Sequence, residues 1–103
     1  MTDIEKNLER DLRKLYEQTR TEVYDPKRFL QMLNKYGPVN TVEKILSSNE
    51  YINEGVKRLY MHRRLDLSIE FFVLENKKYS DLFSEKAKKE AQKRYNELTQ
   101  GII

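Results

Sequence analysis

The chain has 103 residues, of which 36% are charged and none is cysteine, and its formal net charge is +3. This length favours a single domain spanning residues 1–103, and the absence of thiols excludes disulfides, zinc–thiolate centres and cysteine nucleophiles. Because no apolar run approaches the roughly 20 residues of a membrane span and residues 1–5 do not resemble a signal peptide, we expect a soluble, cytoplasmic protein with no membrane contact.

The amino-terminal stretch has the pattern of an amphipathic helix over residues 2–24. Thr2 and Glu5 match a capping box, and Glu9 and Arg13 are spaced as an i,i+4 ion pair. The inward stripe consists of Ile4, Leu8, Leu12, Leu15, Tyr16, Thr19 and Val23. We expect this stripe to face the core of its own domain; the alternative is a surface that forms a homodimer or binds a partner.

A second helix is predicted over residues 26–36. Asp25 has the side chain of an N-cap, and Pro26 suits the first helical position. Gly37 can end this helix in a left-handed conformation, and Pro38 prevents its continuation. The apolar side chains of this helix are Phe29, Leu30, Met32, Leu33 and Tyr36.

Two further helices are predicted before the densest apolar run of the chain. Asn40 and Glu43 match a capping box, which indicates a helix over residues 40–47. The next helix is predicted over residues 50–63, where Gly55 is a weak point because glycine inside a helix costs up to about 1 kcal/mol relative to alanine. The alternative is a shorter helix that begins beside this glycine. The predicted inward side chains are Tyr51, Ile52, Val56, Leu59 and Tyr60.

The densest apolar run of the chain predicts a buried helix over residues 67–74, with Asp66 or Ser68 as its cap. Alternating apolar residues would also suit a strand, but no second strand is available to pair with it. We therefore expect Leu67 and Phe71 at the centre of the core.

A turn at residues 76–78 precedes a last helix, which Ser84 caps and which runs to residue 98. The inward side chains of this region are Tyr79, Leu82, Phe83, Ala87, Ala91, Tyr95 and Leu98. The elements together predict an all-α fold, a compact orthogonal or irregular bundle of about five to six helices around the helix at 67–74.

Reactive groups are sparse, so we expect no enzyme, no metal site and no cofactor. His62 is the one histidine and has no partner at metal-ligand spacing. Asp66 and Glu70 are spaced i,i+4, as a carboxylate pair or a hard-metal site requires. The competing interpretation is structural: Asp66 caps the start of a helix, Glu70 lies at the positive end of that helix, and Arg63 or Arg64 pairs with either carboxylate.

One short segment gathers basic residues among aromatic ones. The candidate binding residues for a partner or a nucleic acid are Lys57, Arg58, His62, Arg63 and Arg64. Basic residues late in a helix are also expected from the helix dipole alone, so this segment does not by itself indicate nucleic acid.

The last helix is rich in lysine, but its charges are arranged in pairs. Glu85 with Lys89 and Glu90 with Arg94 are spaced i,i+4. We expect these pairs to lie on a neutralised, solvated face.

The chain resembles a family of short bacterial proteins of about this length. The motifs are Arg28-Phe29-Leu30-Gln31-Met32-Leu33, Gly55-Val56-Lys57-Arg58-Leu59, Arg64-Leu65-Asp66-Leu67-Ser68-Ile69-Glu70, Val73-Leu74 and Leu82-Phe83. The resemblance implies an all-helical domain and carries no agreed activity, substrate or catalytic residue. The chain departs from the family pattern at Val56, where an aromatic residue is usual, and at Arg63, where a glycine is common.

These features favour a non-enzymatic helical domain that binds another macromolecule, with a protein as the expected partner. The alternative is a DNA- or RNA-binding accessory protein that uses the basic surface around residues 57–64. Salt separates the two, because binding through several phosphate contacts weakens steeply as salt rises.

Overall fold

The computed structural model describes residues 1–48 and 55–101, and every regular element in these ranges is helical. In chain order the elements are α1 (Asp3–Glu22), α2 (Lys27–Tyr36), α3 (Pro38–Ser47), α5 (Lys57–Met61), the 3₁₀ helix η2 (Leu65–Leu67), α6 (Ile69–Glu75), the 3₁₀ helix η3 (Lys77–Leu82) and α7 (Glu85–Thr99). The predicted all-α class is confirmed. None of these helices is long and apolar enough to cross a membrane.

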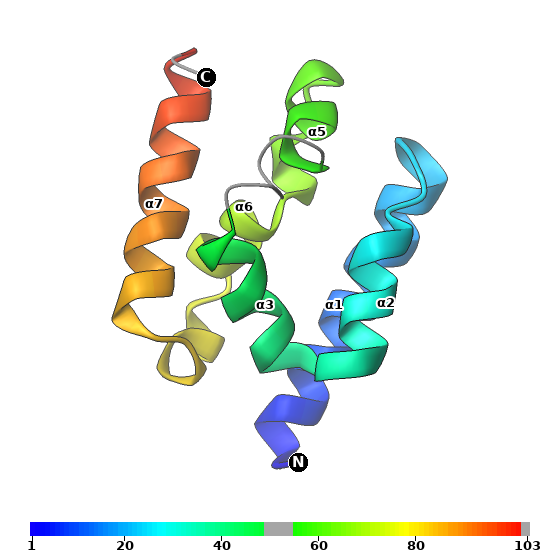
Figure 1. Ribbon diagram of the computed structural model, residues 1–103, viewed down its shortest axis with the longest axis vertical. Helices are drawn as coiled ribbons and strands as arrows, with labels where there is room; N and C mark the ends of the chain where they lie inside the picture. Colours follow the sequence, from blue (N-terminus) through cyan, green and yellow to red (C-terminus); the bar gives the residue numbers. More distant parts are fainter. Residues whose placement is uncertain (49–54, 102–103) are drawn as a thin grey trace.

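The helices form an irregular bundle with α3 and α6 between two flanks (Figure 1). α1 and α2 lie together on one flank, and α7 forms the other. α3 contacts α1, α2, α6 and α7, while α6 packs most extensively against α7. The Cα radius of gyration is 12.7 Å, close to the roughly 13 Å expected for a compact chain of about 100 residues.

The core is shared between α1, α3 and α6. Leu8, Leu12 and Val42 have no exposed surface, and α6 adds Phe72 from its buried face. The prediction that Phe71 lies at the centre is wrong, because its side chain is only half-buried. On a helix of 3.6 residues per turn, the buried residues 69, 72 and 73 share one face, and residue 71 lies on another.

Several predicted helix ends are confirmed. Thr2 and Glu5 form the capping box of α1, with both reciprocal bonds present. Ser68 caps α6 by accepting from the Phe71 N–H, and Ser84 caps α7 in the same way. The predicted helix at 67–74 therefore begins at Ile69, directly after its cap. Gly37 adopts φ +82° between α2 and α3, a conformation that favours glycine.

Two predicted caps are wrong, because their side chains have other partners. The Asp25 carboxylate accepts a 2.7 Å hydrogen bond from the hydroxyl of Tyr16, and α2 begins two residues later. α3 begins at Pro38, so Asn40 is already inside the helix. Glu43 instead accepts two hydrogen bonds from the backbone and hydroxyl of Ser84, at 2.7 and 2.8 Å.

The helix predicted over residues 50–63 falls partly outside the described residues, as do Tyr51 and Ile52. The described portion, α5, covers Lys57–Met61. Val56 and Leu59 are buried as predicted, but Tyr60 is 37% exposed and was wrongly placed inward. Leu59 takes the inward position of this short helix, which turns the adjacent tyrosine towards solvent.

Candidate macromolecule-binding surface around α5

A surface groove of about 680 Å³ runs between the start of α2 and α5. We call it the α2–α5 groove. Its lining residues are Tyr24, Asp25, Pro26, Lys27, Arg28, Phe29, Gly55, Lys57, Arg58 and Met61. Two segments that are about thirty residues apart in the sequence therefore form its walls.

The groove is electropositive. Lys27, Lys57 and Arg58 are exposed, and none of the three forms an ion pair with a carboxylate of residues 1–48 or 55–101. The guanidinium of Arg58 lies 5.0 Å from the centroid of the Tyr24 ring, which is a cation–π arrangement. The fold thus brings two of the predicted binding residues to face a third cation, Lys27, which local sequence clustering does not reveal.

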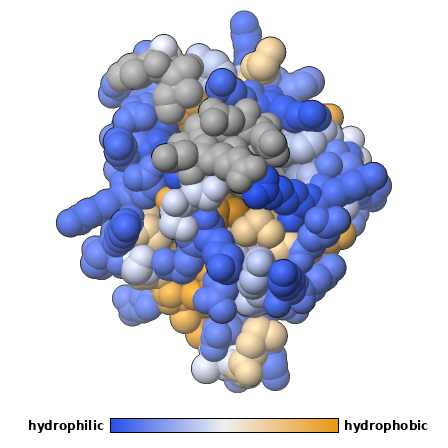
Figure 2. Space-filling model, viewed as in Figure 1, coloured by the Kyte–Doolittle hydropathy of each residue, from blue (hydrophilic) through white to orange (hydrophobic). Residues whose placement is uncertain are grey.

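The carboxyl end of α5 carries the most exposed large apolar side chain of the described residues. Met61 is 79% exposed and Tyr60 is 37% exposed; we call these two residues the α5 crest. Met61 lines the α2–α5 groove and also a second groove of about 610 Å³ on the other side of α5. On the face shown in Figure 2 hydrophilic residues predominate, and hydrophobic residues reach the surface in small patches.

The backbone reverses at Arg63, which has φ +59°. Its N–H donates to the carbonyl of Tyr60 at 3.0 Å, and the next N–H, that of Arg64, donates to Leu59 at 2.8 Å. This pair of bonds is a Schellman motif, in which the left-handed residue is usually glycine. Arg63 therefore holds an exposed cation at a position where its Cβ is sterically unfavourable. His62, beside it, is also exposed.

Arg64 is separated from the other predicted binding residues by its partners. Its Nη1 donates to Glu22 at 2.6 Å, and its Nε and Nη2 donate to Asp66 at 3.1 Å. These hydrogen bonds lower the pKa of Glu22 and the pKa of Asp66, so both carboxylates stay ionised beside the guanidinium. The structural interpretation of Asp66 is confirmed for its pairing with Arg64, and this guanidinium ties the end of α1 to η2.

A second polar cluster lies inside the bundle. Arg94 of α7 is only 2% exposed, although it was predicted on a solvated face. Its guanidinium donates to the carbonyls at the end of α3, those of Ile45, Leu46 and Ser48, at 3.0–3.1 Å. It also donates to Glu90 at 2.7 Å and to the fully buried Glu70 at 3.3 Å. The predicted pair with Glu90 exists, but it extends into the interior.

Glu70 lies in the first turn of α6, at the positive end of the helix as the structural interpretation expected, but it pairs with Arg94 and not with Arg63 or Arg64. Burial raises the pKa of its carboxyl, and its second oxygen has no hydrogen-bond partner among the described residues. The sequence held a signal for the position of Arg94, because residues 87, 91, 94 and 98 follow the four, three, four spacing of one helical face. The charge of the side chain concealed that signal.

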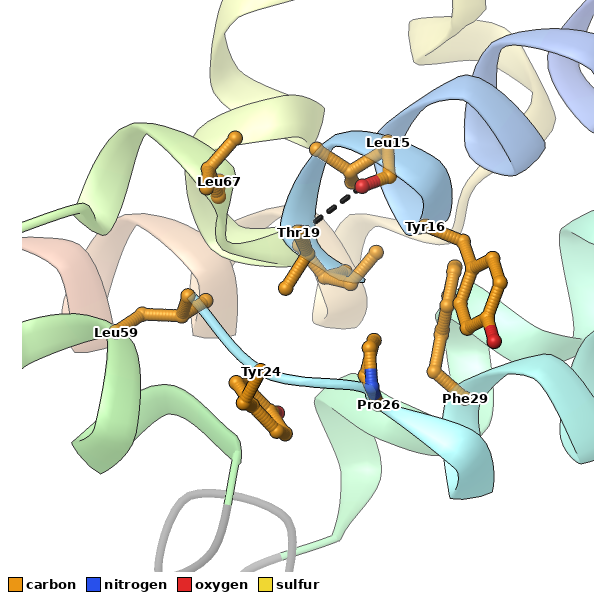
Figure 3. A pocket seen from close by; sticks show the side chains of 9 residues that line it. Leu15, Tyr16, Thr19, Tyr24, Pro26, Phe29, Leu59 and Leu67 are labelled. Carbon is orange, nitrogen blue, oxygen red and sulfur yellow. Dashed lines mark hydrogen bonds between the residues drawn. The ribbon is translucent and has the colours of Figure 1, made fainter. Parts of the chain in front are cut away.

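A small pocket lies between α1, α5, η2 and the start of α2 (Figure 3). Side chains from α1, α2, α5 and η2 converge on it, and the Thr19 hydroxyl turns back to the Leu15 carbonyl at 2.9 Å. Its volume is about 20 Å³, which is near the space of one water molecule. It is a packing gap beneath the surface and is too small for a substrate.

In the described ranges no group of three or more His, Asp or Glu residues is placed to hold a metal ion. No family model, curated protein or solved structure matches the chain.

Proposed function

We propose that this protein is a non-enzymatic helical module that binds a protein partner through the surface around α5. The observation that carries the proposal is the combination of Lys57 and Arg58, which form no ion pair with a described carboxylate, with the α5 crest. A Met side chain with 79% exposure adapts readily to a partner's apolar surface, and methionine is enriched in protein interfaces.

The charges at this surface support binding rather than stability. Elsewhere in the bundle, Arg64 and Arg94 each have carboxylate partners at 3.3 Å or less. Lys57 and Arg58 lack such partners among the described residues and so remain available to an incoming acidic group. Electrostatic complementarity of this kind contributes association rate and specificity.

Nucleic-acid binding is the second candidate, and one observation favours it. Arg58 lies over Tyr24, so a cation and an aromatic ring are together on the electropositive groove, as single-strand binders often have them. Against it, Glu22 and Asp66 neutralise Arg64, and their carboxylates would repel a phosphate backbone that extends beyond the groove.

The test is affinity capture from the native host with a tagged protein and two charge-reversed variants. The groove variant is Lys57→Glu with Arg58→Glu, and the matched control is Lys86→Glu with Lys89→Glu on exposed positions of α7. We expect wild type and control to retain the same protein and the groove variant to lose it, with all three melting at similar temperatures. Retention by the groove variant would overturn the proposal, and capture that nuclease abolishes would support nucleic acid instead.

A further inference from the structure

We infer that the α2–α5 groove receives an acidic peptide segment of the partner, with an apolar side chain of that segment resting on Met61. This inference rests on the proposed function and specifies the chemistry of the partner. The carboxylates of the segment would lie between Lys27 on one wall and Lys57 and Arg58 on the other.

The distribution of charge favours an acidic occupant. The described lining has three exposed cations that form no ion pair with a carboxylate of residues 1–48 or 55–101, namely Lys27, Lys57 and Arg58. Asp25 is the carboxylate of the described lining. A localised field of this kind attracts a short acidic segment more than a uniformly charged partner.

Asp25, the carboxylate of the described lining, does not neutralise the opposite wall. Asp25 accepts the Tyr16 hydroxyl at 2.7 Å and joins the end of α1 to the start of α2. Lys57 and Arg58 lie on α5 and form no ion pair with it. A peptide in the groove would therefore face Lys27, Lys57 and Arg58, none of which pairs with a described carboxylate.

The apolar part of the lining indicates a peptide rather than a polyphosphate. Pro26 and Phe29 form the floor of the groove, since both are buried, and Met61 forms an exposed edge. A phosphate backbone gains nothing from an aliphatic edge, whereas a leucine or phenylalanine of a peptide can bury surface against it at about 25 cal/mol per Å². Peptide segments commonly combine charged contacts with one apolar anchor in this way.

The inference is tested with a fluorescent peptide of glutamates that has a central leucine and phenylalanine. We expect saturable binding at low salt, measured by fluorescence anisotropy, and NMR shifts confined to α2 and α5. Lys57→Glu with Arg58→Glu should weaken binding by about tenfold or more, and Lys27→Glu, on the opposite wall, should weaken it similarly. The control Lys86→Glu with Lys89→Glu should change it by less than about twofold. Met61→Ala should weaken binding by about threefold to tenfold, since it removes only apolar contact.

Three comparisons decide the outcome. A peptide with alanines in place of the glutamates should not bind, and equal binding of the two would overturn the acidic assignment. Binding of a single-stranded oligonucleotide in the groove without binding of the peptide would overturn it in favour of a nucleic acid. If the native partner requires the groove and the acidic peptide fails to bind, the inference fails while the proposed function stands; if neither binds there, both fail.

Discussion

Two regions of this bundle differ in how their positive charges are compensated. Where α3, α6 and α7 meet, Arg94 is 2% exposed and donates to two carboxylates and three carbonyls. At the α2–α5 groove, Lys57 and Arg58 are exposed and meet no described carboxylate. A buried cation must have partners because desolvation is costly, whereas an exposed one keeps its water until a ligand replaces it. The first region therefore contributes to the stability of the fold, and the second presents hydrated cations at the surface.

The strongest test of this contrast is Arg94→Ala. The substitution removes five hydrogen bonds and leaves Glu70 buried without a cation, so we expect unfolding to become easier by about 3–5 kcal/mol. Urea denaturation measures the change. Lys93→Ala, at the exposed neighbouring position, is the control and should stay within about 0.5 kcal/mol of wild type. A loss of less than about 1 kcal/mol for Arg94→Ala would show that the buried cluster does not hold α3 and α7 together.

The buried and half-buried faces of α6 can be compared with two phenylalanine substitutions. Phe72 is 8% exposed and stacks on Tyr79 with ring centroids 6.1 Å apart, so Phe72→Ala should cost about 3–5 kcal/mol. Phe71 is half-buried against Tyr95, and Phe71→Ala should cost roughly half as much. Urea melts of both variants compare them directly. Equal losses would mean that both faces of α6 are buried in solution.

The extent to which the sequence predicted this fold depended on how local the evidence was. Thr2, Ser68 and Ser84 cap helices as expected, because a capping oxygen and the N–H that donates to it lie within three residues. Asp25 has an equally good capping side chain, yet its carboxylate accepts a hydrogen bond from Tyr16, nine residues earlier in the chain. Local rules fail where a tertiary partner competes for the same side chain.

The residues of the candidate site also show which features local sequence reveals and which depend on tertiary partners. Lys57 and Arg58 were predicted within one basic segment with His62, Arg63 and Arg64. Lys27, about thirty residues earlier in the sequence, lines the same groove because the fold places the start of α2 across from α5. Arg64 was predicted with them, and Glu22, 42 residues away, engages it instead. Charge clustering in a sequence identifies candidates, while tertiary partners determine which cations remain available.

The stability that the buried Glu70 contributes and the stability that the exposed Asp66 contributes should change with pH in opposite directions. Burial raises the pKa of Glu70 above 4.5, so the unfolded chain releases this proton at a lower pH than the folded one. Stability is therefore lost as pH rises from about 4.5 through the higher folded pKa, and the free energy of unfolding of wild type relative to Glu70→Gln should fall over that range. At neutral pH the free energy of unfolding of Glu70→Gln should be within about 1 kcal/mol of that of wild type. The amide oxygen of the new side chain can still accept from Arg94, and Arg94 still donates to Glu90.

Asp66→Asn provides the matched exposed case. The hydrogen bond from Arg64 lowers the pKa of Asp66, so the stability that this pair contributes is present above the ordinary pKa and is lost as pH falls through the folded value. Wild type relative to Asp66→Asn should accordingly lose stability on acidification. Denaturation series across the acid range measure both differences, and parallel slopes for the two variants would contradict the contrast between the buried and the exposed pair.

The smallest expected effect concerns Arg63 and separates the cost of its backbone from the use of its charge. Its φ of +59° disfavours any residue with a Cβ, so Arg63→Gly should stabilise the fold by about 0.5–1 kcal/mol, whereas Arg63→Ala should not. Both variants remove the same exposed cation. If Arg63 contributes to partner binding, both should capture the partner more weakly, although only one is more stable. Urea melts measure the effect on stability, and affinity capture measures the effect on binding. An Arg63→Gly variant that is no more stable than Arg63→Ala would show that the backbone at this position is not strained.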